Sequence, residues 1–131
     1  LKEADIITIH VALTKETRHM IGLEELRKMK KTAILVNASR GAVIDENALY
    51  TALKEGWIGA AGLDVLEREP IRKDNRLLEL DNVLMTPHMA WYSSGSLTEI
   101  QTKAAEEVAR VLSGQLPLSL VNKEVLKLKR S

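Results

Sequence analysis

One stretch of the sequence reads Ala33-Ile-Leu-Val-Asn-Ala-Ser-Arg-Gly-Ala-Val-Ile-Asp45. Its apolar half ends at Asn37, which is typical of a strand that is buried on both faces and emerges at the edge of a sheet. Gly41 predicts a tight turn with positive φ that would hold Arg40 in a fixed direction. A guanidinium at the carboxyl end of a parallel strand lies where open α/β sheets bind ligands, and it suits a carboxylate. Taken alone, Arg40 could also be an ordinary surface residue in a loop.

On both sides of this stretch, short apolar runs alternate with helical patterns. Strands are predicted at residues 5–10, 33–37, 58–64 and 82–85, and helices at 22–30, after Asp45 and at 96–113. Gly56 would follow the second helix, while Gly114 would end the third. Ser96 and Glu99 have the spacing of a capping box. This alternation predicts a parallel sheet with right-handed crossovers, followed by a long helix.

Composition excludes several classes of protein. The chain has 131 residues, a net charge of +1 and no cysteine, so we expect no nucleic-acid partner, no disulfide and no thiolate metal site. No apolar run approaches the roughly 18 residues that a membrane span needs. These features favour a cytoplasmic protein without a metal site. Because the first residue is Leu1 and a strand follows at once, we expect the chain to be a piece of a longer protein.

Ionisable side chains follow three of the predicted strands. Arg40 follows the second strand, Asp64 and Glu69 follow the third, and His88 follows the fourth. In a parallel sheet these ends share one edge, where His88 could donate a proton near neutral pH and Glu69 could hold its imidazole. Each residue alone has an ordinary explanation: a loop histidine, a solvated acid, or a turn cap in the case of Asp64. Their coincidence at successive strand ends favours a catalytic site.

Three motifs in this order resemble the D-isomer-specific 2-hydroxyacid dehydrogenase family. They are Asn37-Ala-Ser-Arg-Gly41, Gly62-Leu-Asp-Val-Leu-Glu-Arg-Glu-Pro70 and Asn82-Val-Leu-Met-Thr-Pro-His88. The resemblance implies hydride transfer between a nicotinamide cofactor and a 2-keto or 2-hydroxy acid, in a homodimer. It also implies NAD as the cofactor, with NADP left open.

Carried over residue by residue, the resemblance implies three catalytic residues and a cofactor wall. Arg40 would bind the substrate's carboxylate and carbonyl, His88 would be the acid/base, and Glu69 would pair with that histidine. The implied cofactor-binding residues are Val11, Ala38, Ser39, Arg40, Asp64, His88, Met89, Ala90 and Trp91. Trp91 could line the pocket, or it could simply pack against the cap of the following helix.

The glycine fingerprint of dinucleotide binding, Gly-x-Gly-x-x-Gly, does not occur in the sequence. We therefore expect residues 1–95 to be the second half of a Rossmann-type, doubly wound parallel sheet. Residues 96–131 would lead toward an absent substrate domain. On this interpretation the chain alone does not turn over substrate. The alternative hypothesis is an NAD(H)-sensing binding protein of the corepressor type, which has the same fold.

Overall fold

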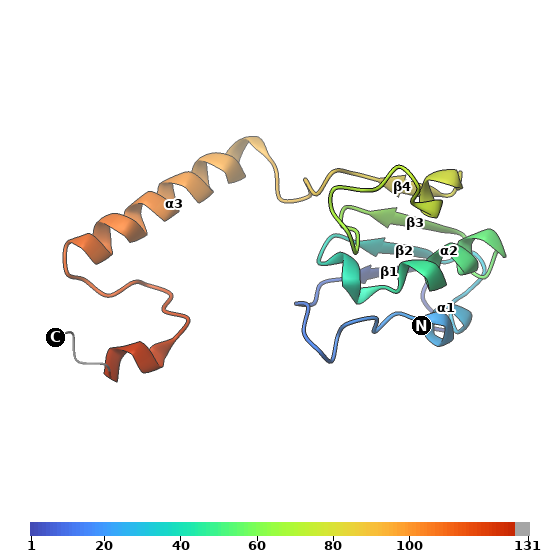
Figure 1. Ribbon diagram of the computed structural model, residues 1–131, viewed down its shortest axis with the longest axis horizontal. Helices are drawn as coiled ribbons and strands as arrows, with labels where there is room; N and C mark the ends of the chain where they lie inside the picture. The colour runs from blue at the N-terminus through green and yellow to red at the C-terminus, as the bar shows by residue number, and fades with distance from the viewer. Residues whose placement is uncertain (128–131) are drawn as a thin grey trace. The chain divides into compact units, whose positions relative to one another are not determined.

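Four short strands form one parallel sheet in the computed structural model, which describes residues 1–127 (Figure 1). The strands are β1 (Ile6–Ile9), β2 (Ile34–Asn37), β3 (Ala60–Leu63) and β4 (Val83–Met85). They lie side by side in chain order, β1-β2-β3-β4, with every neighbouring pair parallel. The predicted parallel sheet is confirmed, with each strand one to three residues shorter at its ends than the sequence suggested.

Two helices and two single turns connect the strands. They are α1 (Leu23–Arg27), η1 (Gly41–Val43), α2 (Glu46–Lys54) and η2 (Arg76–Glu79). Asp45 caps α2, because its carboxylate accepts hydrogen bonds from the amides of Asn47 and Ala48 at 2.9 and 3.1 Å. Gly56 follows α2, as predicted, and has a φ of +69°.

The hydrophobic core lies on one face of the sheet. Leu35 and Leu63 point toward α1 and α2, where they pack with Leu26 and Leu49 in one buried cluster. The opposite face is open within the described residues: Ile34 is 40% exposed and Leu84 is 71% exposed. The prediction that the second strand is buried on both faces is therefore wrong for this chain, because all the crossovers between these strands run over the same face.

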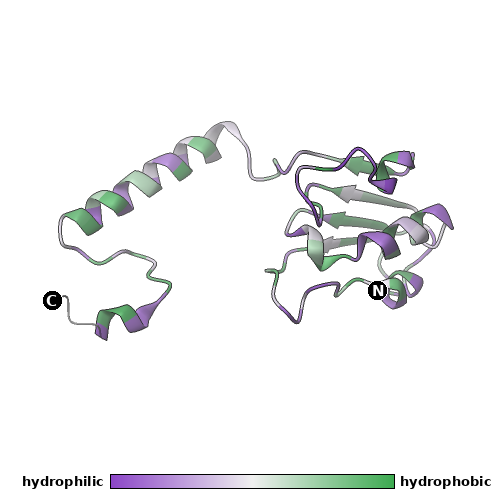
Figure 2. Ribbon diagram, in the orientation of Figure 1, coloured by the Kyte–Doolittle hydropathy of each residue, from purple (hydrophilic) through white to green (hydrophobic). Residues whose placement is uncertain are grey.

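The chain divides into two compact units, residues 1–90 and the part from Trp91 onward. The second unit contains α3 (Ser94–Leu112) and η3 (Lys123–Lys127). Hydrophobic and hydrophilic residues alternate along α3 (Figure 2), and none of its residues is buried. Among residues 1–127, no helix is long and apolar enough to cross a membrane.

The start of α3 differs from the prediction. Ser93 and Ser96 form the capping box, in which the Ser93 hydroxyl accepts from the Ser96 amide and the Ser96 hydroxyl accepts from the Ser93 amide. Glu99 instead pairs with Lys103 one turn further on. Ser93 and Ser96 thus form the two reciprocal hydrogen bonds of the capping box, which the sequence pattern had assigned to Ser96 and Glu99. Gly114 ends the helix region with a φ of +80°, as expected.

Candidate active site

The carboxyl ends of β2, β3 and β4 form one rim of the sheet. Asn37 is in register with Leu63, and Leu63 with Met85, so the residues that follow these strands leave the sheet at the same edge. Arg40, Asp64 and His88 all lie in these exits. Neighbouring strands are about 4.8 Å apart, and β3 separates the strands that carry Arg40 and His88, so the ends of these two strands lie about 10 Å apart.

His88 and Glu69 form a direct pair on this rim. The Nδ1 atom of His88 lies 2.7 Å from Oε2 of Glu69, while Oε1 of Glu69 accepts from the Leu66 amide at 3.0 Å. The hydrogen bond with His88, together with that from the Leu66 amide, lowers the pKa of Glu69 below its usual value despite partial burial. The carboxylate is thus ionised at neutral pH and fixed at both oxygens, so it orients the imidazole ring.

Asp64 holds the turn that carries the histidine. Its side chain accepts hydrogen bonds from the Thr86 hydroxyl and from the amides of Met89 and Ala90, both at 2.8 Å. Burial on its own would raise the pKa of Asp64, but these hydrogen bonds and the charge of His88 lower it overall. The backbone at His88 has a φ of +52°, in the left-handed region. The three bonds of Asp64 therefore stabilise a turn that a non-glycine residue rarely adopts.

The turn that presents Arg40 is organised by Asn37, whose side chain is 1% exposed. Its Oδ1 accepts from the amide and the hydroxyl of Ser39, and its Nδ2 donates to the Arg40 carbonyl at 3.0 Å. The Arg40 guanidinium donates to the Ser39 carbonyl at 2.7 Å, and the side chain is exposed. Sequence reasoning assigned Asn37 no role, although a lone asparagine closing an apolar strand could have indicated one.

Gly41 does not have the predicted positive φ. The glycine is required for a different reason: a Cβ atom at this position would lie 1.9 Å from the Leu66 carbonyl carbon and 2.4 Å from the Glu67 amide nitrogen. The arginine turn therefore touches the backbone of the loop that carries Glu69. This contact joins segments that are about 25 residues apart in the sequence, so local pattern could not show it.

The remaining predicted cofactor residues of the first unit lie around the rim. Val11 is half-buried after β1, Ala38 is exposed after β2, and Met89 is 46% exposed after His88. Trp91 belongs to the second unit, where its carbonyl accepts from the Ser96 hydroxyl and its ring meets Tyr92 edge-on at 5.5 Å.

A mainly apolar cavity of about 380 Å³ adjoins the His88–Glu69 pair. Pro70, Ile71, Leu78 and Met85 are among the residues that line it. A cavity of this kind next to an acid/base pair suits a small organic ligand. Within residues 1–127, no cluster of side chains could hold a metal ion.

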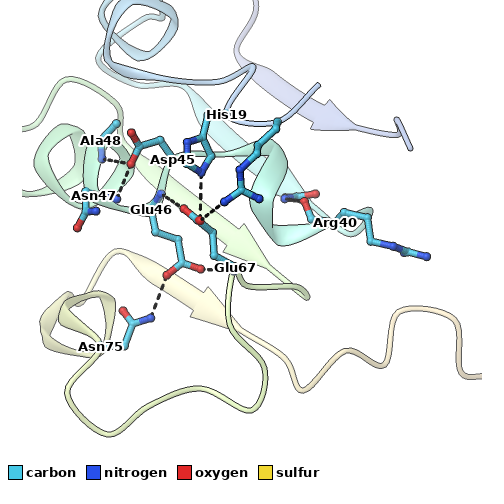
Figure 3. A network of polar contacts seen from close by, with 10 residues as sticks. His19, Arg40, Asp45, Glu46, Asn47, Ala48, Glu67 and Asn75 are labelled. Atoms are coloured by element: carbon cyan, nitrogen blue, oxygen red, sulfur yellow. Dashed lines mark hydrogen bonds and ion pairs between the residues drawn. The ribbon is translucent and has the colours of Figure 1, made fainter. Parts of the chain in front are cut away.

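A second polar network lies beside the arginine turn (Figure 3). Glu67 lies at its centre and is bonded to His19, with Arg18 nearby. Arg18, His19 and Glu67 are not among the site residues predicted from the sequence. No local signal separates a solvated glutamate from one that bonds residues distant in the sequence.

Comparison with known proteins gives a consistent result. A family model described as the NAD-binding domain of D-isomer specific 2-hydroxyacid dehydrogenases matches residues 1–90. The glyoxylate reductase of Korarchaeum cryptofilum is 53% identical over 129 residues, which cover 98% of this chain and 39% of that protein. The D-3-phosphoglycerate dehydrogenase of Methanocaldococcus jannaschii is 54% identical over 121 residues, covering 92% of this chain and 23% of that protein.

Solved structures agree with the sequence relatives. D-lactate dehydrogenase with NAD+ from Lactobacillus jensenii superimposes with a TM-score of 0.84 at 33% identity, over 94% of this chain and 41% of that chain. D-lactate dehydrogenase from Aquifex aeolicus, complexed with NAD and lactic acid, gives 0.80 at 40% identity, over 87% and 39% of the two chains. The chain thus spans about two fifths of the length of these solved structures and of the glyoxylate reductase.

Proposed function

Because this chain belongs to the D-isomer-specific 2-hydroxyacid dehydrogenase family, we propose that its protein transfers a hydride between NAD(P)H and the C2 carbonyl of a small 2-keto acid. The product would be a D-2-hydroxy acid. Glyoxylate is the first substrate to test, since several relatives that are about half identical to this chain bear the name glyoxylate reductase. We expect the complete protein to be a cytoplasmic homodimer with no nucleic-acid or membrane partner.

The single observation that carries the proposal is the His88–Glu69 pair, with 2.7 Å between Nδ1 and Oε2, on the same sheet rim as Arg40. An ionised carboxylate orients the imidazole, which suits a proton donor. A guanidinium suits the carboxylate that every 2-keto acid carries.

The rim also fits a nicotinamide cofactor. The residues from Ala38 to Arg40 and from His88 to Ala90 are at least partly accessible, and Val11 and Met89 offer apolar surface. These residues would hold the nicotinamide end. The sequence of this chain has no Gly-x-Gly-x-x-Gly turn, which is the motif that binds the pyrophosphate of a dinucleotide. When bound, NAD(P)H supplies the hydride.

The chain's own residues would handle the substrate and the proton. Arg40 binds the carboxylate of the keto acid and orients its carbonyl. Because Nδ1 of His88 is engaged by Glu69, the proton passes from Nε2 to the carbonyl oxygen as the C2 carbon is reduced. In the reverse direction the neutral imidazole accepts the hydroxyl proton. General acid help of this kind accelerates a reaction by about 10²–10⁴-fold.

Replacing His88 in the complete protein tests the proposal. We expect His88→Ala to lower kcat for NADH-dependent glyoxylate reduction by at least about 10²-fold, because the proton donor is lost. Absorbance of NADH measures turnover, and tryptophan fluorescence measures whether NADH still binds. Lys103→Ala, which removes one side of an exposed ion pair in α3, is the matched surface control.

The same variant separates the enzyme from the corepressor-type sensor. A sensor needs NADH binding and no proton donor, so its wild type would bind NADH without reducing any 2-keto acid, and His88→Ala would change nothing. That result would contradict the proposed reaction.

A further inference from the structure

We infer that Glu67 is a positioning residue that holds Arg40 in place relative to the His88–Glu69 pair by joining the three loops that leave β1, β2 and β3. This inference rests on the proposed function. It concerns residues outside the predicted site, and it is drawn from the network in Figure 3.

Glu67 bonds to two other loops at once. Its Oε2 lies 3.0 Å from Nε2 of His19 in the loop after β1, and Nη2 of Arg18 lies 3.8 Å away. Its Oε1 accepts from the amide of Glu46, the first residue of α2, at 3.1 Å. A single side chain thus joins three segments that are neighbours in space only.

Glu46 in turn accepts a hydrogen bond from Glu67. Its Oε1 accepts from the Glu67 amide, and its Oε2 accepts from Nδ2 of Asn75 at 3.1 Å. The carboxylates of Glu46 and Glu67 repel each other, but the positive end of α2 and the guanidinium of Arg18 offset the repulsion. The reciprocal bonds between Glu46 and Glu67 therefore fix the start of α2 against the loop after β3.

Each of the three loops carries a residue of the proposed site. Val11 lies in the first loop, Arg40 in the second and Glu69 in the third. Backbone hydrogen bonds extend the connection: the His19 amide donates to the Ala42 carbonyl at 2.8 Å, directly after the arginine turn. On the other side of Glu67, the Leu66 amide donates to Glu69.

Two features indicate that this arrangement is held under constraint. His19 has a φ of +53°, a left-handed conformation that is uncommon outside glycine and persists only where surrounding contacts determine it. Gly41 packs against Leu66 and Glu67 so closely that no side chain fits. Figure 3 shows the Arg40 side chain extending away from the glutamates, so the network holds the turn and leaves the guanidinium available.

A double-mutant cycle in the complete protein tests the inference. We expect Glu67→Ala to lower kcat/KM for glyoxylate by about tenfold, because a displaced arginine turn misplaces the substrate. In an Arg40→Ala background the same change should lower kcat/KM less than about twofold, since Glu67 acts through Arg40. Glu67→Gln retains an acceptor for the Glu46 amide and a partner for His19, so it should recover most of the loss.

Glu99→Ala is the matched control, because it removes an exposed glutamate that pairs with Lys103 in α3. It should leave kcat/KM unchanged. Equal losses from Glu67→Ala with and without Arg40 would overturn the inference in favour of general destabilisation. A loss below about threefold in the single variant would also overturn it.

Hydrogen exchange gives a reading that does not depend on turnover. Glu67→Ala should lower the protection of the Val43 and Glu46 amides by at least about tenfold, while amides in β3 keep theirs. If the wild-type protein shows no reductase activity, the proposed function fails. This measurement still decides whether Glu67 holds the loops after β1 and β2 in place. Unchanged protection of both amides would refute the positioning role of Glu67.

Discussion

At the scale of single residues, Asp64 carries the clearest electrostatic consequence. It is 8% exposed and accepts three hydrogen bonds from the turn around His88, which together lower its pKa from the ordinary value of 3.8. A carboxylate whose pKa is lowered by folding stabilises the folded state above the ordinary pKa. That stabilisation disappears as the pH falls through the lower, folded pKa.

We therefore expect Asp64→Asn to loosen the histidine turn in a pH-dependent way. Protection factors for the Met89 and Ala90 amides should fall by about 5- to 150-fold at about pH 7, the equivalent of losing about 1–3 kcal/mol of hydrogen bonding. Below pH 3.8 the difference in protection between wild type and variant should shrink, because the wild-type carboxyl becomes protonated and is then uncharged like the asparagine. A difference of constant size across this range would contradict the assignment.

The sequence predicted that Asp64 lies at the rim, but it did not predict which groups Asp64 hydrogen-bonds. Its position after a strand was visible, whereas its partners Thr86, Met89 and Ala90 are at least 22 residues away. The same limit applies to Glu67. Residue type and position predict which groups reach the sheet edge, while partners distant in the sequence emerge only once the strands pair.

At the scale of elements, the contact between η1 and the loop after β3 can be tested through Gly41. Gly41→Ala would place a Cβ 1.9 Å from the Leu66 carbonyl carbon, so one backbone segment must move. We expect a fall in Tm and a loss of reductase activity of at least about tenfold, because both Arg40 and Glu69 are attached to the displaced segments.

Gly95→Ala is the control for this change, since nothing lies within 4 Å of a Cβ at that position in α3. Alanine favours a helix over glycine by about 1 kcal/mol, so the control should leave Tm unchanged or slightly raised. Wild-type activity in Gly41→Ala would show that the two segments are not in rigid contact.

Helix termini show which element boundaries local chemistry determines. The Asp45 cap and the positions of Gly56 and Gly114 after α2 and α3 were predicted, because capping depends on residues within one turn. The N-cap of α3 was predicted three residues too late, at Ser96 instead of Ser93, since Ser93 and Ser96 satisfy the same pattern as Ser96 and Glu99. Where two local solutions coexist, the pattern alone does not choose between them.

At the scale of the whole molecule, the family and the half of the Rossmann-type fold were both predicted and are confirmed by the match over residues 1–90 and by the superposed dehydrogenases. Alternation of strands and helices predicts a parallel sheet, and consecutive strands pair with one another in the order β1-β2-β3-β4. What alternation did not reveal is that one face of this sheet is open, since burial depends on neighbours in space.

The proposed catalytic rim and the lack of a glycine fingerprint lead to a prediction for the chain on its own. The proposed cofactor wall around Arg40, Asp64 and His88 would hold the nicotinamide end, but the sequence has no glycine-rich turn of the Gly-x-Gly-x-x-Gly type to place a helix N-terminus against the pyrophosphate charges. We expect isothermal titration of the 131-residue chain with NADH to show a Kd weaker than about 1 mM, an affinity below about 4 kcal/mol. Circular dichroism of the same sample, showing helix and strand, ensures that weak binding does not reflect unfolding. Micromolar binding by this folded chain would mean that the rim alone holds the dinucleotide. It would contradict the expectation that the rim residues hold just the nicotinamide end.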